Sequence, residues 1–170
     1  EYLDHTSNTI YVAFKVKKTN KDFLKDTSII IWTTTPWTIP ANKALAFNSN
    51  IEYSVLEIEN LEHFKEKRIV VAKNLIESIT KECEIKSYTE LRTFKGSEFK
   101  GTLCSHPFAK MDFNYDVPML DAQFVNLDQG TGIVHCAPSH GPDDFNLCLK
   151  NNIPSLYTVD NAGVYTKEVP

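Results

Sequence analysis

Apolar and polar side chains alternate along several short stretches of the chain, a pattern that is typical of half-buried β-strands. Ile10, Val12, Phe14 and Val16 share one face of a predicted strand over residues 9–17. A β-branched run over residues 28–33 indicates a buried strand. Further strands or extended segments are expected over residues 52–59, 68–72, 84–94, 119–126 and 132–137.

Helical periodicity is confined to two segments. Leu75, Ile76 and Ile79 share one face of a predicted helix over residues 73–82, and residues 141–152 favour a second helix. Glycines within residues 94–101 indicate a turn and another short strand. The pattern predicts a β-rich α+β fold over residues 1–170, a single domain with a barrel-like core of short strands and a few peripheral helices.

Composition and charge narrow the class of protein. The chain is 42% hydrophobic and 24% charged, and its net charge of −4 does not favour an independent nucleic-acid-binding protein. Four separate cysteines without a C-x-x-C pair indicate a reduced protein, with a cytoplasmic location expected and neither a disulfide framework nor a membrane span. The chain begins with Glu rather than Met, which suggests a piece of a longer protein.

The segment WTTTPWTIPAN, residues 32–42, is the first candidate site. Threonines 33–35 stand between Trp32 and Trp37, and two prolines argue against a helix through the segment. Hydroxyls between bulky aromatic side chains suggest a site for a small ligand with polar ends. The alternative is a strand end whose hydroxyls are bonded to backbone groups.

The segment GTGIVHCAPSHGPDDF, residues 130–145, is the second candidate site. Gly132 permits tight backbone geometry beside a ligand, and Val134 is expected to face the core while His135 faces a cavity. Asp143 and Asp144 fall in the predicted first turn of a helix, where the helix dipole favours acidic side chains. Structural duty at the helix start is therefore an alternative to a functional role for Asp144.

Other kinds of chemistry find weaker support. His135 and His140 together with Asp143, Asp144 or Cys136 would make a metal site, but their spacing matches no known ligand pattern. His106 is interpreted as a structural turn histidine. No G-x-S-x-G segment or phosphate-binding loop is present in the sequence.

The two candidate segments together resemble the editing domain (connective peptide 1) of isoleucyl-tRNA synthetase, which is inserted into the nucleotide-binding fold of a class I synthetase. Residues 1–14, 94–108 and 159–170 resemble it too. The valyl and leucyl enzymes have a TTRP-like motif where this chain has TTTPW, and they lack a His at the position of His135. Both differences favour a resemblance to the isoleucyl enzyme. The signatures H-I-G-H and K-M-S-K-S are absent, so this chain is not expected to charge tRNA; ATP and Mg²⁺ belong to the parent enzyme's aminoacylation site, and editing requires no cofactor.

The resemblance implies hydrolysis of Val-tRNA(Ile), with valyl-adenylate as a further candidate substrate, in a pocket that excludes isoleucine by size. The expected partners are the 3′ aminoacyl-adenosine end of tRNA(Ile) and the remaining domains of the parent synthetase, and a monomer is expected. A non-catalytic module that binds the tRNA 3′ end and a metal-dependent hydrolase are the rival interpretations. The implied catalytic residues are Asp144 as the partner of the substrate ammonium, Thr33, Thr34, Thr35 and Thr38 as hydroxyl donors, and His135 as the gate; Trp37, Trp32, Gly132 and Asp143 are the implied substrate-binding residues.

Overall fold

The computed structural model describes residues 8–59 and 66–169 of the chain. Within these residues, nine strands form one mixed sheet in the order β6-β4-β5-β2-β1-β7-β8-β3-β9. The strands are β1 (Ile10–Lys18), β2 (Ser28–Thr33), β3 (Ala44–Phe47), β4 (Glu52–Ile58), β5 (Arg68–Ala72), β6 (Tyr88–Lys95), β7 (Leu103–Ser105), β8 (Asp116–Asp121) and β9 (Val134–Cys136). The helices are α1 (Ile76–Glu82) and α2 (Pro142–Lys150), and four 3₁₀ turns are η1 (Asp22–Leu24), η2 (Pro36–Ala41), η3 (Lys73–Leu75) and η4 (Gly96–Phe99).

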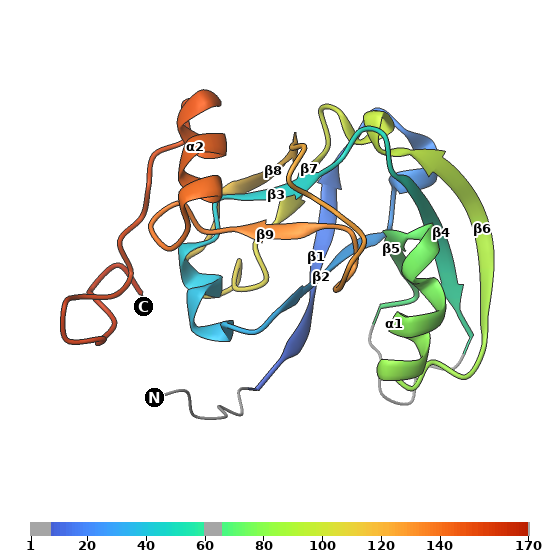
Figure 1. Cartoon of the computed structure of the whole chain (residues 1–170), viewed down its shortest axis with the longest axis horizontal. Coiled ribbons are helices and arrows are strands. Elements are labelled where there is room, and N and C mark those ends of the chain that lie inside the picture. The colour runs from blue at the N-terminus through green and yellow to red at the C-terminus, as the bar shows by residue number, and fades with distance from the viewer. Residues whose placement is uncertain (1–7, 60–65, 170) are drawn as a thin grey trace.

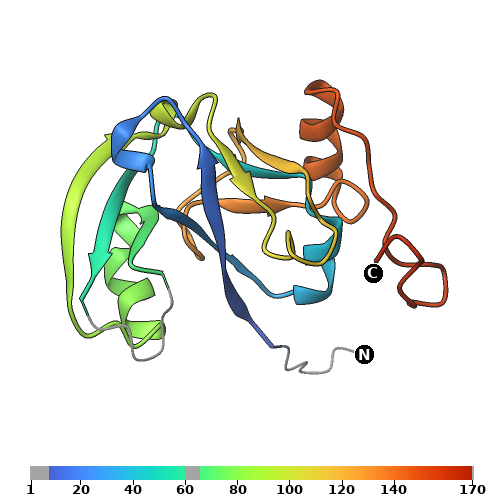
Figure 2. The same cartoon turned by 180° about the vertical axis from the view of Figure 1, so that it is seen from behind.

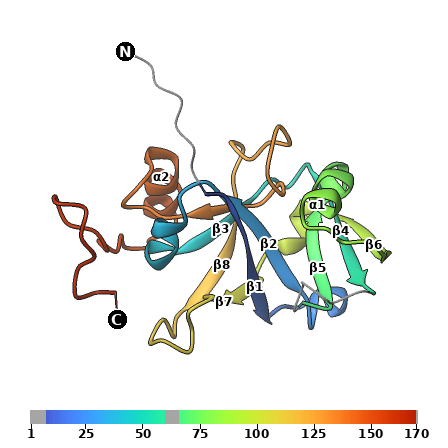
Figure 3. The same ribbon diagram turned by 90° about the horizontal axis from the view of Figure 1, so that it is seen from below.

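The central pair of strands joins two halves of the sheet. β1 pairs antiparallel with β2 on one side and with β7 on the other. In Figures 1 and 2 these strands cross the middle of the molecule, between the β4–β5–β6 half and the β3–β8–β9 half. Figure 3 shows α1 and α2 at opposite ends of this arrangement.

A single large core lies against one face of the curved sheet. Phe14 of β1, Leu45 of β3 and Tyr53 of β4 all belong to it, so strands from both halves turn side chains toward the same interior. Burial of this apolar surface is the main stabilising contribution to the fold. Two smaller clusters lie beneath the helices, one between α1 and strands β2, β4 and β5, and one between α2 and strands β3 and β9.

The predicted β-rich α+β class is confirmed, but the sheet does not close into a barrel. β6 and β9 are the two edge strands and are not paired with one another among the described residues. The run of β-branched residues in β2 is buried on both faces: Ile29 and Ile31 enter the main core, and Ile30 packs in the cluster beneath α1. This two-sided burial explains why β2 shows no polar alternation.

Most predicted elements are confirmed, and three local expectations were wrong. The prolines of residues 32–42 do not prevent helical structure, since η2 has Pro36 in its first turn and Pro40 inside it. The predicted strand over residues 119–126 ends at Asp121. Val134 is 36% exposed instead of facing the core. The first seven residues, part of the segment 1–14 that resembles the synthetase domain, lie outside the described residues.

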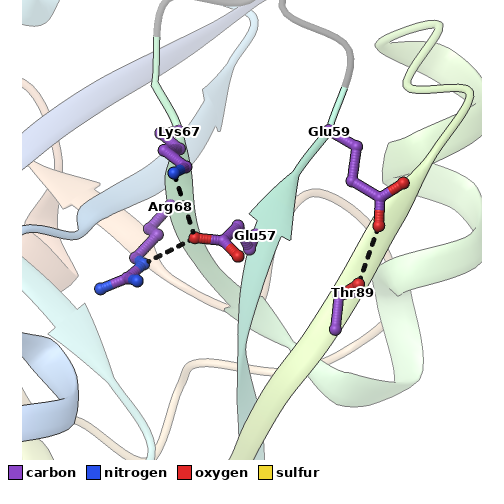
Figure 4. Close-up of polar contacts among 5 residues, drawn as sticks. All are labelled: Glu57, Glu59, Lys67, Arg68 and Thr89. Atoms are coloured by element: carbon purple, nitrogen blue, oxygen red, sulfur yellow. Dashed lines mark hydrogen bonds and ion pairs between the residues drawn. The ribbon is translucent and has the colours of Figure 1, made fainter.

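The outer end of the β4–β5–β6 half is polar. Arg68 Nε donates to Glu57 Oε1 at 3.1 Å across the β4–β5 pair, and Lys67 Nζ lies 3.6 Å from the same oxygen. Thr89 of β6 donates to Glu59 at 2.8 Å (Figure 4). Exposed pairs of this kind contribute about 0–1 kcal/mol each, so these contacts add little to the stability of the fold.

Candidate active site

A cavity of about 240 Å³ lies between two segments that are about a hundred residues apart in the sequence. One wall comes from the end of β2 and from η2, and the other from β9, the turn that follows it and the first turn of α2. The pairing of β3 with β9 brings the walls together, because Leu45 stands opposite His135 in the ladder. The lining residues are Trp32, Thr33, Thr34, Thr35, Trp37, Thr38, Val134, His135, Ala137, His140 and Asp144.

The threonine wall is a chain of hydroxyls at the point where β2 ends. The Thr35 N–H donates to Thr33 Oγ1 at 3.1 Å, and the Thr38 hydroxyl donates to the Thr35 carbonyl at 2.9 Å. These bonds stabilise the sharp turn into η2. The alternative interpretation, that the threonine hydroxyls bond to backbone groups, is therefore confirmed for Thr33 and Thr38. Thr34 and Thr35 nevertheless remain exposed along the cavity. Both side chains are accessible to a ligand.

His135 is held at both ring nitrogens. Asn42 Nδ2 donates to the carbonyl of Ala44 at 2.9 Å and lies 2.9 Å from His135 Nδ1, so the amide nitrogen faces two acceptors. The ring proton must therefore be on Nε2, which lies 2.9 Å from Thr38 Oγ1. The hydrogen bonds then run in one direction, from Asn42 through His135 and Thr38 to the Thr35 carbonyl.

This arrangement makes His135 a fixed neutral wall. Burial, together with the neighbouring His106 and His140, lowers the pKa of His135 to about 4. A proton on Nδ1 would also point at the Asn42 N–H, which reinforces the neutral form. With both nitrogens engaged, the imidazole is poorly placed to act as a general base. Asn42 was not among the predicted site residues, although it is the last residue of the quoted WTTTPWTIPAN segment.

Asp144 presents a carboxylate to the opposite side of the cavity. It stands in the first turn of α2, and its Oδ2 accepts the N–H of Ala137 at 2.9 Å. Burial raises the pKa of Asp144 above its ordinary value, the Ala137 N–H opposes this rise, and the charge of Asp143 adds to it. None of the salt bridges within residues 8–59 and 66–169 involves Asp144. The half-buried carboxylate therefore lacks a cationic partner within this part of the protein.

Two of the predicted site residues lie outside the cavity lining. Asp143 is exposed at the second position of α2, where it complements the helix dipole. Gly132 has a φ of +73° and packs so closely on Ala72 that an added Cβ would lie 2.4 Å from the Ala72 Cβ. The structure thus gives Gly132 a packing role next to the site. The other eight predicted residues line the cavity.

The back of η2 is anchored by buried aromatic side chains. His106 Nε2 donates to the Ile39 carbonyl at 3.0 Å, and its Nδ1 accepts the Phe108 N–H at 3.1 Å. The ring stacks on Phe113 with centroids 4.7 Å apart, and burial lowers the pKa of His106 to about 4. Tyr115 donates to the Asn42 carbonyl at 2.6 Å. His106 therefore supports the wall from outside the cavity, in line with its interpretation as a structural residue.

The described residues contain no group of three or more His, Cys, Asp or Glu side chains placed to hold a metal ion. Among them there is also no helix with the length and apolarity that a membrane span requires.

Comparison with known proteins places these features in a family context. Residues 6–169 match a family model described as leucyl-tRNA synthetase, editing domain. The chain is 62% identical over its whole length to an isoleucine–tRNA ligase of Pelagibacter ubique and 43% identical to one of Gluconobacter oxydans. It spans only 19% and 18% of the length of these two relatives.

Solved structures agree on the fold. The editing domain of the P. knowlesi cytosolic leucyl-tRNA synthetase superposes with a TM-score of 0.64 at 16% identity, covering 84% of this chain and 60% of that one. The corresponding P. falciparum domain gives a TM-score of 0.58 at 18% identity, covering 74% and 47%. At such low identity the likeness concerns the arrangement of the strands and helices alone.

Proposed function

The chain belongs to the family of aminoacyl-tRNA synthetase editing domains, in the form found in isoleucine–tRNA ligases, and on this premise we propose that it hydrolyses the ester of valine misattached to tRNA(Ile). The observation that carries the proposal is the Asp144 carboxylate, which faces the cavity without a cationic partner among the described residues. An aminoacyl ester brings an α-ammonium group, which is the cation that such a site lacks. Pairing would offset the cost of keeping this carboxylate half-buried and ionised.

The threonine wall suits the other end of the substrate. Thr34 and Thr35 are exposed residues whose hydroxyls would bind the ribose of the terminal adenosine and an attacking water. The water oxygen adds to the ester carbonyl, the bond to the ribose oxygen breaks, and the ribose oxygen takes the proton, which releases valine and tRNA. Because an aminoacyl ester is already reactive, positioning the water and stabilising the oxyanion supply the rate enhancement without a strong base.

Size selection belongs to His135 in this proposal. Its ring is held by Asn42 and Thr38 and cannot swing aside without breaking two buried hydrogen bonds. A rigid wall makes an additional methylene costly, because overpacking a fixed cavity requires strain. Valine is therefore accepted and isoleucine excluded.

The test is Asp144→Asn, which keeps the shape of the side chain and removes its charge. Deacylation of Val-tRNA(Ile) should fall about 10- to 100-fold, the range expected for the loss of a charge-assisted hydrogen bond. The assay should be run as single turnovers with the protein in excess, because a net charge of −4 predicts weak affinity for tRNA.

Asp143→Asn is the matched control, because Asp143 is the neighbouring residue on α2 and lies outside the cavity lining. It should keep at least about half of the activity. An equal loss of deacylation in both variants would show that the effect comes from charge at the start of α2. It would contradict the proposal that Asp144 binds the substrate ammonium.

The rival functions give different results in the same assay. A binding module would hold a nonhydrolysable valyl-adenosine analogue in an Asp144-dependent manner but release no valine from the ester. A metal-dependent hydrolase built on His135 and His140 would lose activity after exhaustive chelation. The proposed mechanism predicts full activity in chelator.

A further inference from the structure

A proline inside η2 deprives one carbonyl of its donor. In a 3₁₀ helix each N–H bonds to the carbonyl three residues earlier, as Thr38 does with Thr35 and Asn42 does with Ile39, both at 3.0 Å. Pro40 has no N–H, so it cannot supply the corresponding bond to the carbonyl of Trp37. The Tyr165 hydroxyl takes this place and donates to the Trp37 carbonyl at 3.0 Å.

Tyr165 stands on a hairpin that is braced before it reaches η2. Val159 and Tyr165 form an antiparallel bridge, and the Asp160 N–H donates to the Val164 carbonyl at 2.9 Å. Asp160 Oδ1 also accepts the N–H groups of Ala162 and Val164, at 2.8 and 3.0 Å. The hairpin that carries the Tyr165 hydroxyl is therefore stabilised by its own hydrogen bonds.

The same C-terminal segment is bonded to the opposite wall. Ser139, in the turn between β9 and α2, donates its hydroxyl to the Leu156 carbonyl at 2.7 Å. In Figures 1 and 3 the segment leaves α2 and runs down the side of the molecule where η2 lies. It thus contacts both sides of the cavity, through Ser139 on one and through Trp37 on the other.

We propose that Tyr165 is a positioning residue of the cavity, acting through the backbone of Trp37; this rests on the proposed function. The Trp37 indole lines the cavity and packs against His140, with ring centroids 5.0 Å apart and planes at 83°. This aromatic contact joins the two walls at the rim. Fixing the Trp37 carbonyl therefore fixes the rim against which the ligand is held.

The exposure of the pair determines which property should change. Trp37 and Tyr165 are each 47% exposed, so water can replace the lost hydroxyl and the fold should survive its removal. Water does not hold the carbonyl in one place. Loss of the hydroxyl should therefore reduce ligand affinity much more than stability.

The experiment compares Tyr165→Phe with the unsubstituted chain. KM for the valyl ester should rise about three- to tenfold with kcat within about twofold, and Tm should fall by less than about 2 °C. The chain has two tryptophans. In ¹H–¹⁵N spectra the indole signal of Trp37 should shift or broaden while that of Trp32 stays.

Two further variants sharpen the test. Tyr157→Phe is the matched control, because Tyr157 is 67% exposed and its hydroxyl makes no hydrogen bond within the described parts of the chain. This substitution should change neither the Trp37 indole signal nor KM. Adding Pro40→Ala to Tyr165→Phe restores a backbone N–H to η2 and should recover the Trp37 signal and KM. If the double variant recovers neither the Trp37 signal nor KM, the proposal that the Tyr165 hydroxyl replaces the missing N–H of residue 40 is overturned.

The indole spectrum separates this proposal from the proposed function. If the chain cleaves no valyl ester but Tyr165→Phe perturbs Trp37 as described, the positioning role stands and the hydrolytic function fails. If the ester is cleaved and Tyr165→Phe changes neither KM nor the Trp37 signal, the positioning role is overturned.

Discussion

His135 illustrates what a residue type can predict and what it cannot. His135 lies on a predicted strand and lines the cavity as expected, but the alternation argument was wrong, because His135 is buried and Val134 is 36% exposed. The place of Asp144 in the first turn of a helix was predicted from the sequence. The protonation state of His135 was not, because this depends on Asn42, which lies 93 residues away. The exposure of Val134 was missed for a similar reason: β9 is an edge strand, and only the assembled sheet shows which of its faces is covered.

Removing the imidazole should relax size selection. His135→Ala opens the wall between Thr38 and Asn42, so isoleucine should enter the cavity. We expect deacylation of cognate Ile-tRNA(Ile) to rise by about tenfold or more relative to the unsubstituted chain, since an additional methylene changes selectivity by this order. The measurement is the ratio of Ile-tRNA to Val-tRNA cleavage. A variant that still protects Ile-tRNA would show that His135 is not the gate.

Removing Asn42 should loosen the same ring without deleting it. Asn42→Ala leaves His135 Nδ1 and the Ala44 carbonyl buried without their donor, which should cost about 1–3 kcal/mol in the free energy of unfolding. The rise in Ile-tRNA cleavage should be smaller than in His135→Ala. Urea unfolding and the cleavage ratio measure the two effects. Asn151→Ala, which removes one exposed bond to Leu147, is the control and should change neither.

At the scale of the elements, alternation predicted the longer strands and apolar runs predicted the buried β2 and β5, but β3 was missed. β3 is four residues long with every side chain buried, so its sequence carries no alternation. η2 was missed because proline was taken to exclude a helix, whereas a short 3₁₀ turn tolerates Pro36 at its start and Pro40 when another donor is supplied. Barrel closure depends on whether β6 and β9 meet, and no local pattern encodes such a long-range pairing.

The junction before β9 offers a test of backbone geometry. Gly132→Ala would combine a φ of +73° with a Cβ 2.4 Å from the Ala72 Cβ, and we expect a loss of about 2–4 kcal/mol in the free energy of unfolding. Gly163→Ala is the matched control, because its φ is +80° with no atom within 4 Å of the new Cβ. It should cost only about 1 kcal/mol. Equal losses in urea unfolding would show that close packing at Gly132 contributes nothing.

For the whole molecule, two buried histidines predict acid sensitivity. The pKa values of His106 and His135 are lowered to about 4 from an ordinary 6.5, so the unfolded chain binds more protons between these values. Stability should therefore fall as the pH is lowered from about 6.5 to 4, by up to about 3 kcal/mol for each histidine. The raised pKa of Asp144 acts in the opposite sense in its own range.

Urea unfolding at pH 7 and pH 4.5 measures this dependence. In His135→Gln the fall should be about half of that in the unsubstituted chain, because one of the two histidines is gone. If the free energy of unfolding falls as much in His135→Gln as in the unsubstituted chain, His135 does not contribute to the pH dependence.

The walls of the cavity come from residues 32–38 and 134–144, and the β3–β9 pairing is what sets them face to face. A ribosome delivers these walls at different times. Until residues 134–144 have emerged, the nascent chain carries the hydroxyls but not yet the acidic side chain opposite them. The cavity can therefore form only after its second wall has been synthesised.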